Sequence, residues 1–234
     1  MQSPDSGHAQ ANQLFALGTE LFETGDVPGA ISAFESVAET GLQSDALSYN
    51  LGTAYLHQQD YGRAILHLER AAGSASVSER AEHNLRIAYE RAGVARRPPS
   101  AVVAAGNAAT RIAGPLGWFF AGLLALTLAS VLTGIGIAKS DIFRFRRYVL
   151  LTIWAAAILL VSVNVVIWQN TLTPDAIVLG SADLHRSPSP QSAVNSSVVV
   201  GLRVRITEEL DGWNRIELAN GTHGWLPAEF VEQI

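Results

Sequence analysis

The sequence of 234 residues contains no cysteine and few charged residues. The absence of cysteine excludes thiol catalysis, thiolate metal ligands and disulfide bonds. Charged residues make up 16% of the chain and hydrophobic residues 48%, whereas soluble domains carry about 25% charged residues. This shortfall indicates that part of the chain does not face water. The high hydrophobic content also excludes an intrinsically disordered protein.

An excess of basic residues is missing as well. The net charge is −5 and the pI is about 5.7, so the chain lacks the basic footprint of nucleic-acid-binding proteins and we expect no nucleic-acid partner. The six histidines stand in no metal-ligand pattern such as HExxH, and no nucleophile lies in a recognisable catalytic motif. We therefore expect no catalytic residues, no metal site, no cofactor and no enzymatic activity.

The first third of the chain repeats itself with a period of 34 residues. This interval separates Leu17, Leu51 and Leu85; Leu21, Tyr55 and Tyr89; Gly18 and Gly52; Asp26 and Asp60; Ala30 and Ala64; Ile31 and Ile65. Such a period is typical of tetratricopeptide repeats, helix–turn–helix units that bury their apolar faces by stacking. The sequence predicts an all-α tetratricopeptide-repeat domain over residues 1–93, with two repeats over 11–44 and 45–77 and a capping helix over 79–92.

The first helix of each predicted repeat carries the candidate binding residues of this domain. By resemblance to other tetratricopeptide proteins, these helices line a concave groove. The candidate groove residues are Asn12, Phe15, Thr19, Phe22, Tyr49, Thr53, Leu56, His57, His83 and Ile87. Their aromatic and aliphatic character favours an apolar helix or an extended segment as the ligand. The alternative is that the aromatic residues simply pack between the helices.

Two long uncharged runs occupy the middle of the chain. Residues 112–138 and residues 148–174 each form a run of 27 residues without a charge, and about 20 apolar residues of helix span the hydrocarbon core of a bilayer. The sequence predicts a linker over 94–114, followed by a two-helix transmembrane hairpin. Its helices are 115–138 and 148–170, joined by a basic loop over 139–147. Membrane lipid is therefore an expected partner.

The predicted orientation of the hairpin depends on the four basic residues of this loop, Lys139, Arg144, Arg146 and Arg147. The positive-inside rule places the loop in the cytoplasm and both termini outside. Three arginines before the first run favour the opposite orientation: Arg96, Arg97 and Arg111. An N-terminal domain of this size reaches the outside most easily behind a signal peptide, but the first ten residues lack the basic and apolar regions of one. We therefore expect that a signal peptide has been removed. The alternative is that both soluble domains are cytoplasmic.

The last third of the chain changes to short β-branched runs separated by turn residues. The predicted strands are Ala176–Gly180, Ser197–Val200, Arg203–Glu208, Trp213–Leu218 and Thr222–Pro227. Asn220-Gly221 predicts a type I′ hairpin turn between the last two. Two Gly-Trp pairs and a final Pro-x-x-Phe-Val resemble a bacterial SH3 domain, a small all-β barrel, over residues 175–234. Trp213 and Trp225 are its candidate binding residues, and packing in the core or a groove wall is the alternative.

The order of these three parts resembles one protein family over Ala11–Ile234: the E component of the bacterial aerotolerance (Bat) operon. The resemblance implies a multidomain scaffold bound to the bacterial inner membrane, with both soluble domains periplasmic. It also implies protein partners of two kinds, von Willebrand A-domain membrane proteins and a MoxR-type AAA ATPase.

We therefore expect a non-enzymatic adaptor that presents two interaction modules on one membrane face. Two alternatives stay open. One is an envelope sensor whose SH3-like domain binds cell-wall peptide or glycan. The other is an adaptor anchored to the cytoplasmic face of the inner membrane.

Overall fold

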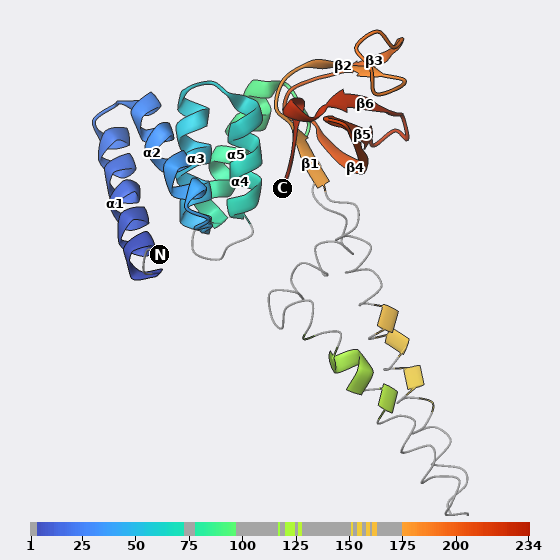
Figure 1. Cartoon of the computed structure of the whole chain (residues 1–234), viewed down its shortest axis with the longest axis horizontal. Coiled ribbons are helices and arrows are strands. Elements are labelled where there is room, and N and C mark those ends of the chain that lie inside the picture. The colour runs from blue at the N-terminus through green and yellow to red at the C-terminus, as the bar shows by residue number, and fades with distance from the viewer. Residues whose placement is uncertain are drawn as a thin grey trace, which may run out of the picture. The chain divides into compact units, whose positions relative to one another are not determined.

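The computed structural model describes residues 4–72, 78–96 and 175–234, together with short helical stretches between residues 117 and 162 (Figure 1). The chain divides into two compact units. The first combines Met1–Arg97 with Pro174–Ile234, and the second is Pro98–Thr173. Segments from both ends of the chain therefore share the first unit.

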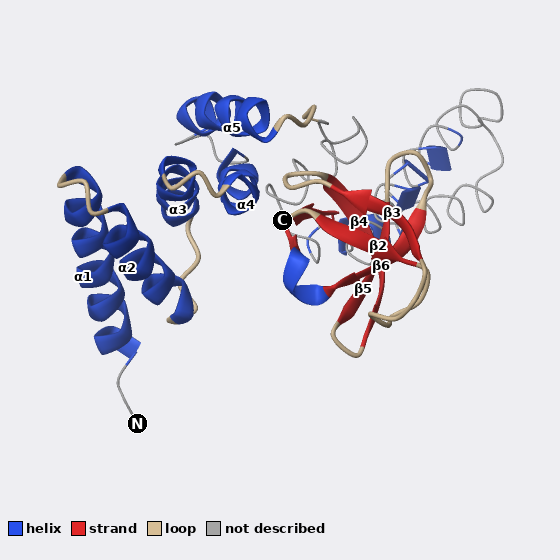
Figure 2. Ribbon diagram, turned by 90° about the horizontal axis from the view of Figure 1, so that it is seen from above, coloured by secondary structure: helices blue, strands red, loops and turns tan. Residues whose placement is uncertain are grey.

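Five helices form the N-terminal part of the first unit. Their bounds are α1 Pro4–Glu23, α2 Val27–Glu39, α3 Asp45–His57, α4 Tyr61–Ala72 and α5 Ser78–Ala92. α1 packs against α2, α3 packs against α4, and α4 also packs against α5 (Figure 2). The helices thus form two successive pairs, with α5 following the second pair.

The turns within the two pairs are built alike, 34 residues apart. Gly25 and Gln59 end the first helix of each pair with φ values of 88° and 64°. The next residues, Asp26 and Asp60, donate their backbone N–H to carbonyls five residues earlier, at 2.9 and 3.0 Å, as in a Schellman motif. Their carboxylates then accept hydrogen bonds from the N–H groups three residues later, at 3.0 and 3.1 Å, and cap the second helix. The repeated turn accounts for the recurrence of aspartate at Asp26 and Asp60.

Two glycines allow close contact between the helices of each pair. A Cβ atom on Gly18 would lie 2.6 Å from the ring of Phe34, and one on Gly52 would lie 2.6 Å from Cγ of Leu68. Phe34 and Leu68 are almost completely buried in the core of the helical region. Ile177, which comes from the C-terminal part of the chain, belongs to the same core.

The C-terminal part of the first unit is an all-β sheet of seven antiparallel strands, in the order β3-β2-β6-β5-β4-β1-β7. Its elements are β1 Asp175–Val178, β2 Ala182–His185, β3 Val194–Val198, β4 Arg203–Leu210, β5 Trp213–Glu217, β6 His223–Pro227, the 3₁₀ helix η1 Ala228–Phe230 and β7 Val231–Gln233. The core of the sheet contains Ala176, Val178, Leu184, Val198, Val204, Ile206, Ile216, Leu226 and Val231.

The strands differ from the prediction in number and in one position. β2 and β7 were not predicted as strands, because each is short and buries a single side chain, Leu184 or Val231. Such segments carry little alternation of polar and apolar residues. The strand predicted at Ser197–Val200 lies instead at Val194–Val198, where pairing with β2 determines its bounds.

The predicted type I′ turn at Asn220-Gly221 is wrong. Such a turn requires positive φ at both central residues, but here only Gly221 has one, at 80°. The N–H of Gly221 donates to the carbonyl of Leu218 at 2.9 Å and closes a longer loop. The type I′ geometry occurs one hairpin earlier, at Asp211 and Gly212, with φ values of 47° and 79°.

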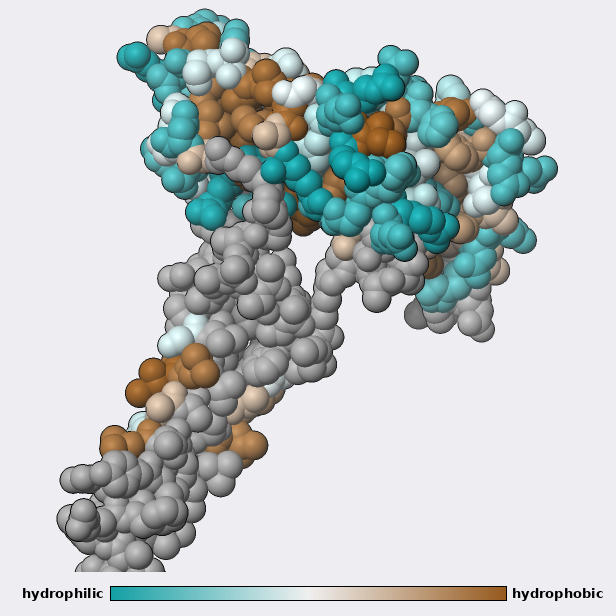
Figure 3. Space-filling view, turned by 180° about the vertical axis from the view of Figure 1, so that it is seen from behind, coloured by the Kyte–Doolittle hydropathy of each residue, from teal (hydrophilic) through white to brown (hydrophobic). Residues whose placement is uncertain are grey.

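The predicted linker, membrane helices and basic loop lie largely outside the described residues, and Lys139, Arg144, Arg146 and Arg147 lie entirely outside them. The described residues between 117 and 162 are mostly apolar, as their brown colour shows (Figure 3). Within the parts of the chain that the structure describes, no helix combines the length and apolar character needed to cross a membrane.

Candidate interaction surfaces

The ten predicted groove residues lie on α1, α3 and α5, and we call them the A-helix face. Asn12, His57 and His83 are exposed, and the other seven are half-buried. A half-buried side chain can contact both the helical core and a ligand. Whether the A-helix face binds a partner stays a prediction.

Contacts between neighbouring helices join these residues into one surface. The rings of Phe22 on α1 and His57 on α3 meet edge to face, with centroids 5.1 Å apart. From α5, the amide of Asn84 donates to the hydroxyl of Thr53 at 3.0 Å. The guanidinium of Arg80 lies 5.1 Å from the ring centroid of Tyr49, within the range of a cation–π interaction.

Sequence reasoning missed Arg80 and Asn84 as members of this surface. A signal was available, because Arg80 and Asn84 are spaced by four residues on α5 and so share one side of the helix with the predicted His83 and Ile87. Their addition gives the surface an amide and a cation beside its aromatic rings.

The aromatic residues of the A-helix face also pack inward. Phe15 lies 5.6 Å from Phe34, centroid to centroid, and Phe15, Phe22, Tyr49 and Leu56 all contact the helical core. The hydroxyls of Thr19 and Thr53 donate to the carbonyls of their own helices four residues earlier, at 3.0 and 2.8 Å. The arrangement therefore suits a ligand that contacts aromatic edges and a few polar groups.

On the sheet, the two predicted tryptophans lie in different surroundings. Trp225 is 8% exposed, which corresponds to packing. Trp213 is half-buried, and its ring meets that of His185 edge to face with centroids 5.3 Å apart. Trp213 also lies opposite Pro227 in the pairing of β5 with β6. Trp213, His185 and Pro227 form a partly exposed patch, which we call the Trp213 patch.

The second repeat holds two titratable groups that contact each other, Tyr55 on α3 and His67 on α4. Burial, with the nearby Arg70 and Arg63, lowers the pKa of His67 to about 4. The His67 ring stacks on Tyr55, with centroids 5.6 Å apart. Burial, and then a hydrogen bond to Glu35, raise the pKa of Tyr55 above its ordinary value. These groups stay neutral near pH 7 and serve packing.

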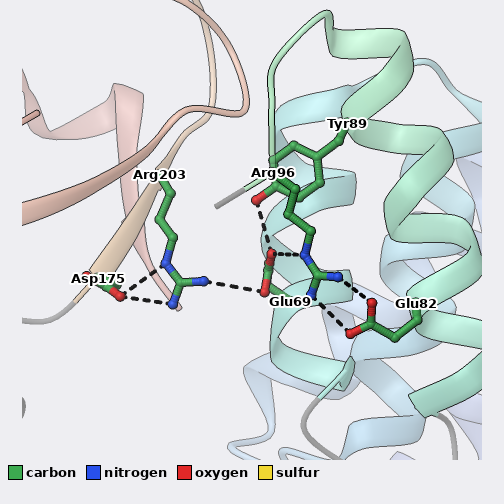
Figure 4. A network of polar contacts seen from close by, with 6 residues as sticks. All are labelled: Glu69, Glu82, Tyr89, Arg96, Asp175 and Arg203. Atoms are coloured by element: carbon green, nitrogen blue, oxygen red, sulfur yellow. Dashed lines mark hydrogen bonds and ion pairs between the residues drawn. The ribbon is translucent and has the colours of Figure 1, made fainter. Parts of the chain in front are cut away.

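A polar network surrounds Glu69 of α4, whose side chain is 6% exposed (Figure 4). It accepts a hydrogen bond from the hydroxyl of Tyr89 at 3.0 Å and another from Nε of Arg96 at 3.2 Å. Burial, and then the charge of Glu69, raise the pKa of Tyr89. Burial alone would lower the pKa of Arg96, but its hydrogen bonds to Glu82 and Glu69 outweigh burial and raise the pKa.

The same network extends from the helices to the sheet. Arg203 of β4 lies 3.6 Å from Glu69 and 2.9 Å from Asp175, as Figure 4 shows. Beside it, Arg70 of α4 lies 2.9 Å from Glu232 of β7 and donates to the carbonyl of Gln233. Oppositely charged groups of the two parts therefore face one another along α4.

In residues 4–72, 78–96 and 175–234, no three His, Asp or Glu side chains converge as metal ligands would. The chemistry that the described side chains offer is contact with apolar and aromatic groups, together with hydrogen bonding.

Two known protein families match parts of this chain. The tetratricopeptide repeat family matches residues 15–79, and the bacterial SH3 domain family matches residues 180–232. A comparison with curated proteins finds no significant match. The predicted fold class is confirmed in its coarse form, a helical tetratricopeptide-like region followed by an all-β sheet consistent with an SH3 domain. Both families are interaction modules, so the matches indicate a protein-interaction or adaptor role.

Proposed function

We propose that this protein is a non-enzymatic adaptor anchored in the bacterial inner membrane by residues 115–170. It presents the A-helix face and the Trp213 patch on the same side of the membrane. Its partners are von Willebrand A-domain membrane proteins and a MoxR-type ATPase, as the resemblance to the aerotolerance E component implies.

The observation that carries this proposal is the connection between Arg96 and Asp175. Arg96 is the last described residue before the middle segment, and Asp175 is the first after it. Arg96 binds Glu69, Glu69 faces Arg203, and Arg203 binds Asp175. One network of side chains in the first unit therefore links the two described residues that flank residues 97–174. Flanks that are linked in this way suit a segment that crosses a membrane twice, as do its two uncharged runs.

Anchoring both modules together has a physical consequence for binding. A partner that touches both surfaces meets the second one at an effective concentration set by the first contact. Each contact can be weak while the combined affinity is high. An adaptor of this kind requires no catalytic group.

The orientation can be tested because the chain has no cysteine. Gln43 and Ala219 are exposed and lack positive φ, so Gln43→Cys and Ala219→Cys introduce single thiols without backbone strain. Ser140→Cys places a third in the basic loop. A membrane-impermeant maleimide added to cells with a permeabilised outer membrane should label the first two variants and spare the third. Labelling of Ser140→Cys alone would establish the cytoplasmic adaptor instead.

The scaffold role predicts that the A-helix face captures its partners. His57→Ala together with His83→Ala removes two exposed side chains of this face. Co-purification of the A-domain proteins and the ATPase with the full chain should fall about tenfold or more. Ser32→Ala together with Glu39→Ala, two exposed changes on α2, is the matched control. Equal recovery from both double variants would exclude this face as the capture site.

A second candidate function is an envelope sensor, which the half-buried Trp213 beside His185 favours. In this case the Trp213 patch binds cell-wall peptide or glycan. Full chain in detergent should then be retained on purified sacculi, and Trp213→Ala should abolish retention. Val199→Ala, which shortens a side chain that is 49% exposed, is the control. Full chain that passes through without retention would leave the scaffold alone.

A further inference from the structure

Helix α4 is buried on two sides, which is unusual for the second helix of the last complete repeat. In a stack of repeats, the helices of each unit cover those of the unit before it. After α4 the structure describes one more helix, α5, and then the chain enters the second unit. No second helix of a third repeat lies among the described residues. Yet Gly62, Ile65, Leu66 and Leu68 of α4 are all buried.

Strand β1 of the sheet covers a side of α4 that α3 and α5 leave uncovered. A Cβ atom on Gly62 would lie 2.2 Å from the carbonyl oxygen of Leu179, directly after β1. A Cβ atom on Gly201 would lie 2.6 Å from Cδ1 of Ile65. Neither position has room for a side chain. Glycine at residues 62 and 201 therefore allows the helix and the sheet to approach each other closely.

The side chains of β1 alternate between two cores. Ala176 and Val178 belong to the core of the sheet. Ile177 belongs to the core of the helices, and Leu179 packs against the same helical core. Ile177 is completely buried. A strand with one face in each core joins the two parts in the way that a further helix would join a repeat array.

We propose that the sheet is the C-terminal cap of the repeat array and stands where a sixth helix would lie. The sequence predicted α5 as the cap, but these contacts assign that role to β1 and its neighbours. The helices and the sheet then form one cooperative unit, into which residues 97–174 are inserted. The sheet surface formed by β1 and β7 is consequently unavailable to partners, while the A-helix face and the Trp213 patch keep a constant separation.

The proposal predicts that damage on one side of this interface loosens both parts. Gly62→Ala in the full chain places a methyl group against the carbonyl of Leu179, although alanine by itself suits a helix better than glycine. Amide hydrogen exchange measured by mass spectrometry should become about tenfold faster or more in α4 and α5 and in β1 and β7. Gly7→Ala is the matched control, because a Cβ there meets nothing within 4 Å, and it should accelerate no segment.

A second variant keeps the test decisive if Gly62→Ala does not fold. Leu179→Ala shortens a half-buried side chain of the sheet part and leaves every helix residue unchanged. Exchange in α4 and α5 should become about threefold faster or more, whereas Val199→Ala should leave these helices as they are. If α4 and α5 exchange at wild-type rates while β1 and β7 accelerate, the sheet merely docks on a self-sufficient array and the proposal is overturned. Unchanged exchange throughout would overturn it equally.

Discussion

Glu69 of the helical array and Arg203 of the sheet lie 3.6 Å apart, with side chains that are 6% and 15% exposed. The two residues are 134 positions apart in the sequence. Little water reaches the pair, and Glu69 satisfies its remaining hydrogen-bonding capacity with Tyr89 and Arg96. These partners offset part of the cost of burying the carboxylate, and its removal leaves Arg96 with Glu82 alone and Arg203 with Asp175 alone as carboxylate partners.

Glu69→Ala should therefore reduce the free energy of unfolding by about 2–4 kcal/mol. Glu82→Ala is the control, because Glu82 also binds Arg96 but is 46% exposed, and an exposed pair contributes about 1 kcal/mol or less. Urea unfolding of the full chain followed by circular dichroism measures both. Losses of equal size would show that the burial of Glu69 has no effect on its contribution.

The two glycines at the helix crossings should respond differently to alanine. At Gly52 the new Cβ would lie 2.9 Å from the backbone nitrogen of Leu68, whereas at Gly18 the closest atoms belong to the Phe34 ring. A ring can shift more easily than a helix backbone. We expect Gly52→Ala to cost about 2–3 kcal/mol and Gly18→Ala about 1–2 kcal/mol, measured by thermal unfolding. A stabilising effect at either position would contradict the close approach of the helices.

His67 should make the protein sensitive to acid. Its pKa is about 4 in the folded chain and 6.5 ordinarily, so the unfolded state binds more protons between these values. The stabilising effect of the neutral ring is complete above about pH 6.5 and is lost as the pH falls toward 4, by up to about 3 kcal/mol.

The variant His67→Phe isolates this effect because it keeps an aromatic ring against Tyr55 and cannot take up a proton. Urea unfolding at pH 7 and at pH 4.5 should show a loss that is larger in the wild type than in the variant by about 2 kcal/mol. Carboxylates that titrate in this range contribute equally to both proteins. Identical losses would mean that His67 titrates in the folded protein as it does in water.

The two tryptophans of the sheet should separate stability from binding. Trp225→Ala removes a buried ring and should cost about 3–5 kcal/mol. Trp213→Ala removes a half-buried ring and should cost less than about 2 kcal/mol, because much of its surface already faces water. Near-ultraviolet circular dichroism during heating reports the unfolding of each variant. A larger loss for Trp213→Ala would identify Trp213 as the main packing residue.

Much of the helical region could be predicted from the sequence, because the determinants are local. The spacing of Gly25, Asp26, Gln59 and Asp60 specifies the turns and caps through backbone hydrogen bonds to nearby residues. β4 and β5 were predictable for the same reason, since their short-range alternation of buried and exposed residues reflects one buried face. For the A-helix face, the sequence predicted ten residue positions but not the contacts of Arg80 and Asn84 with them.

Burial at equivalent repeat positions was decided by the tertiary structure alone. Leu51 and Leu85 are 2% and 0% exposed, whereas Leu17 is 45% exposed. The three leucines share one register, but α1 is the first helix among the described residues. Leu51 and Leu85 are covered because other helices precede α3 and α5. In the described part of the chain no helix precedes α1.

The sequence by itself determined the repeat period, the helix caps and the β character of the last third, since all of these depend on residues close together in the chain. Only the tertiary structure decided that β1 enters the helical core and that Arg96 and Asp175 meet through Glu69 and Arg203. These contacts join segments separated by residues 97–174. The continuous apolar run of β1 shows that both faces of the strand are apolar, but it does not show which core receives each face. That choice depends on the packing of α4 against the sheet at Gly62 and Gly201, which no local pattern encodes.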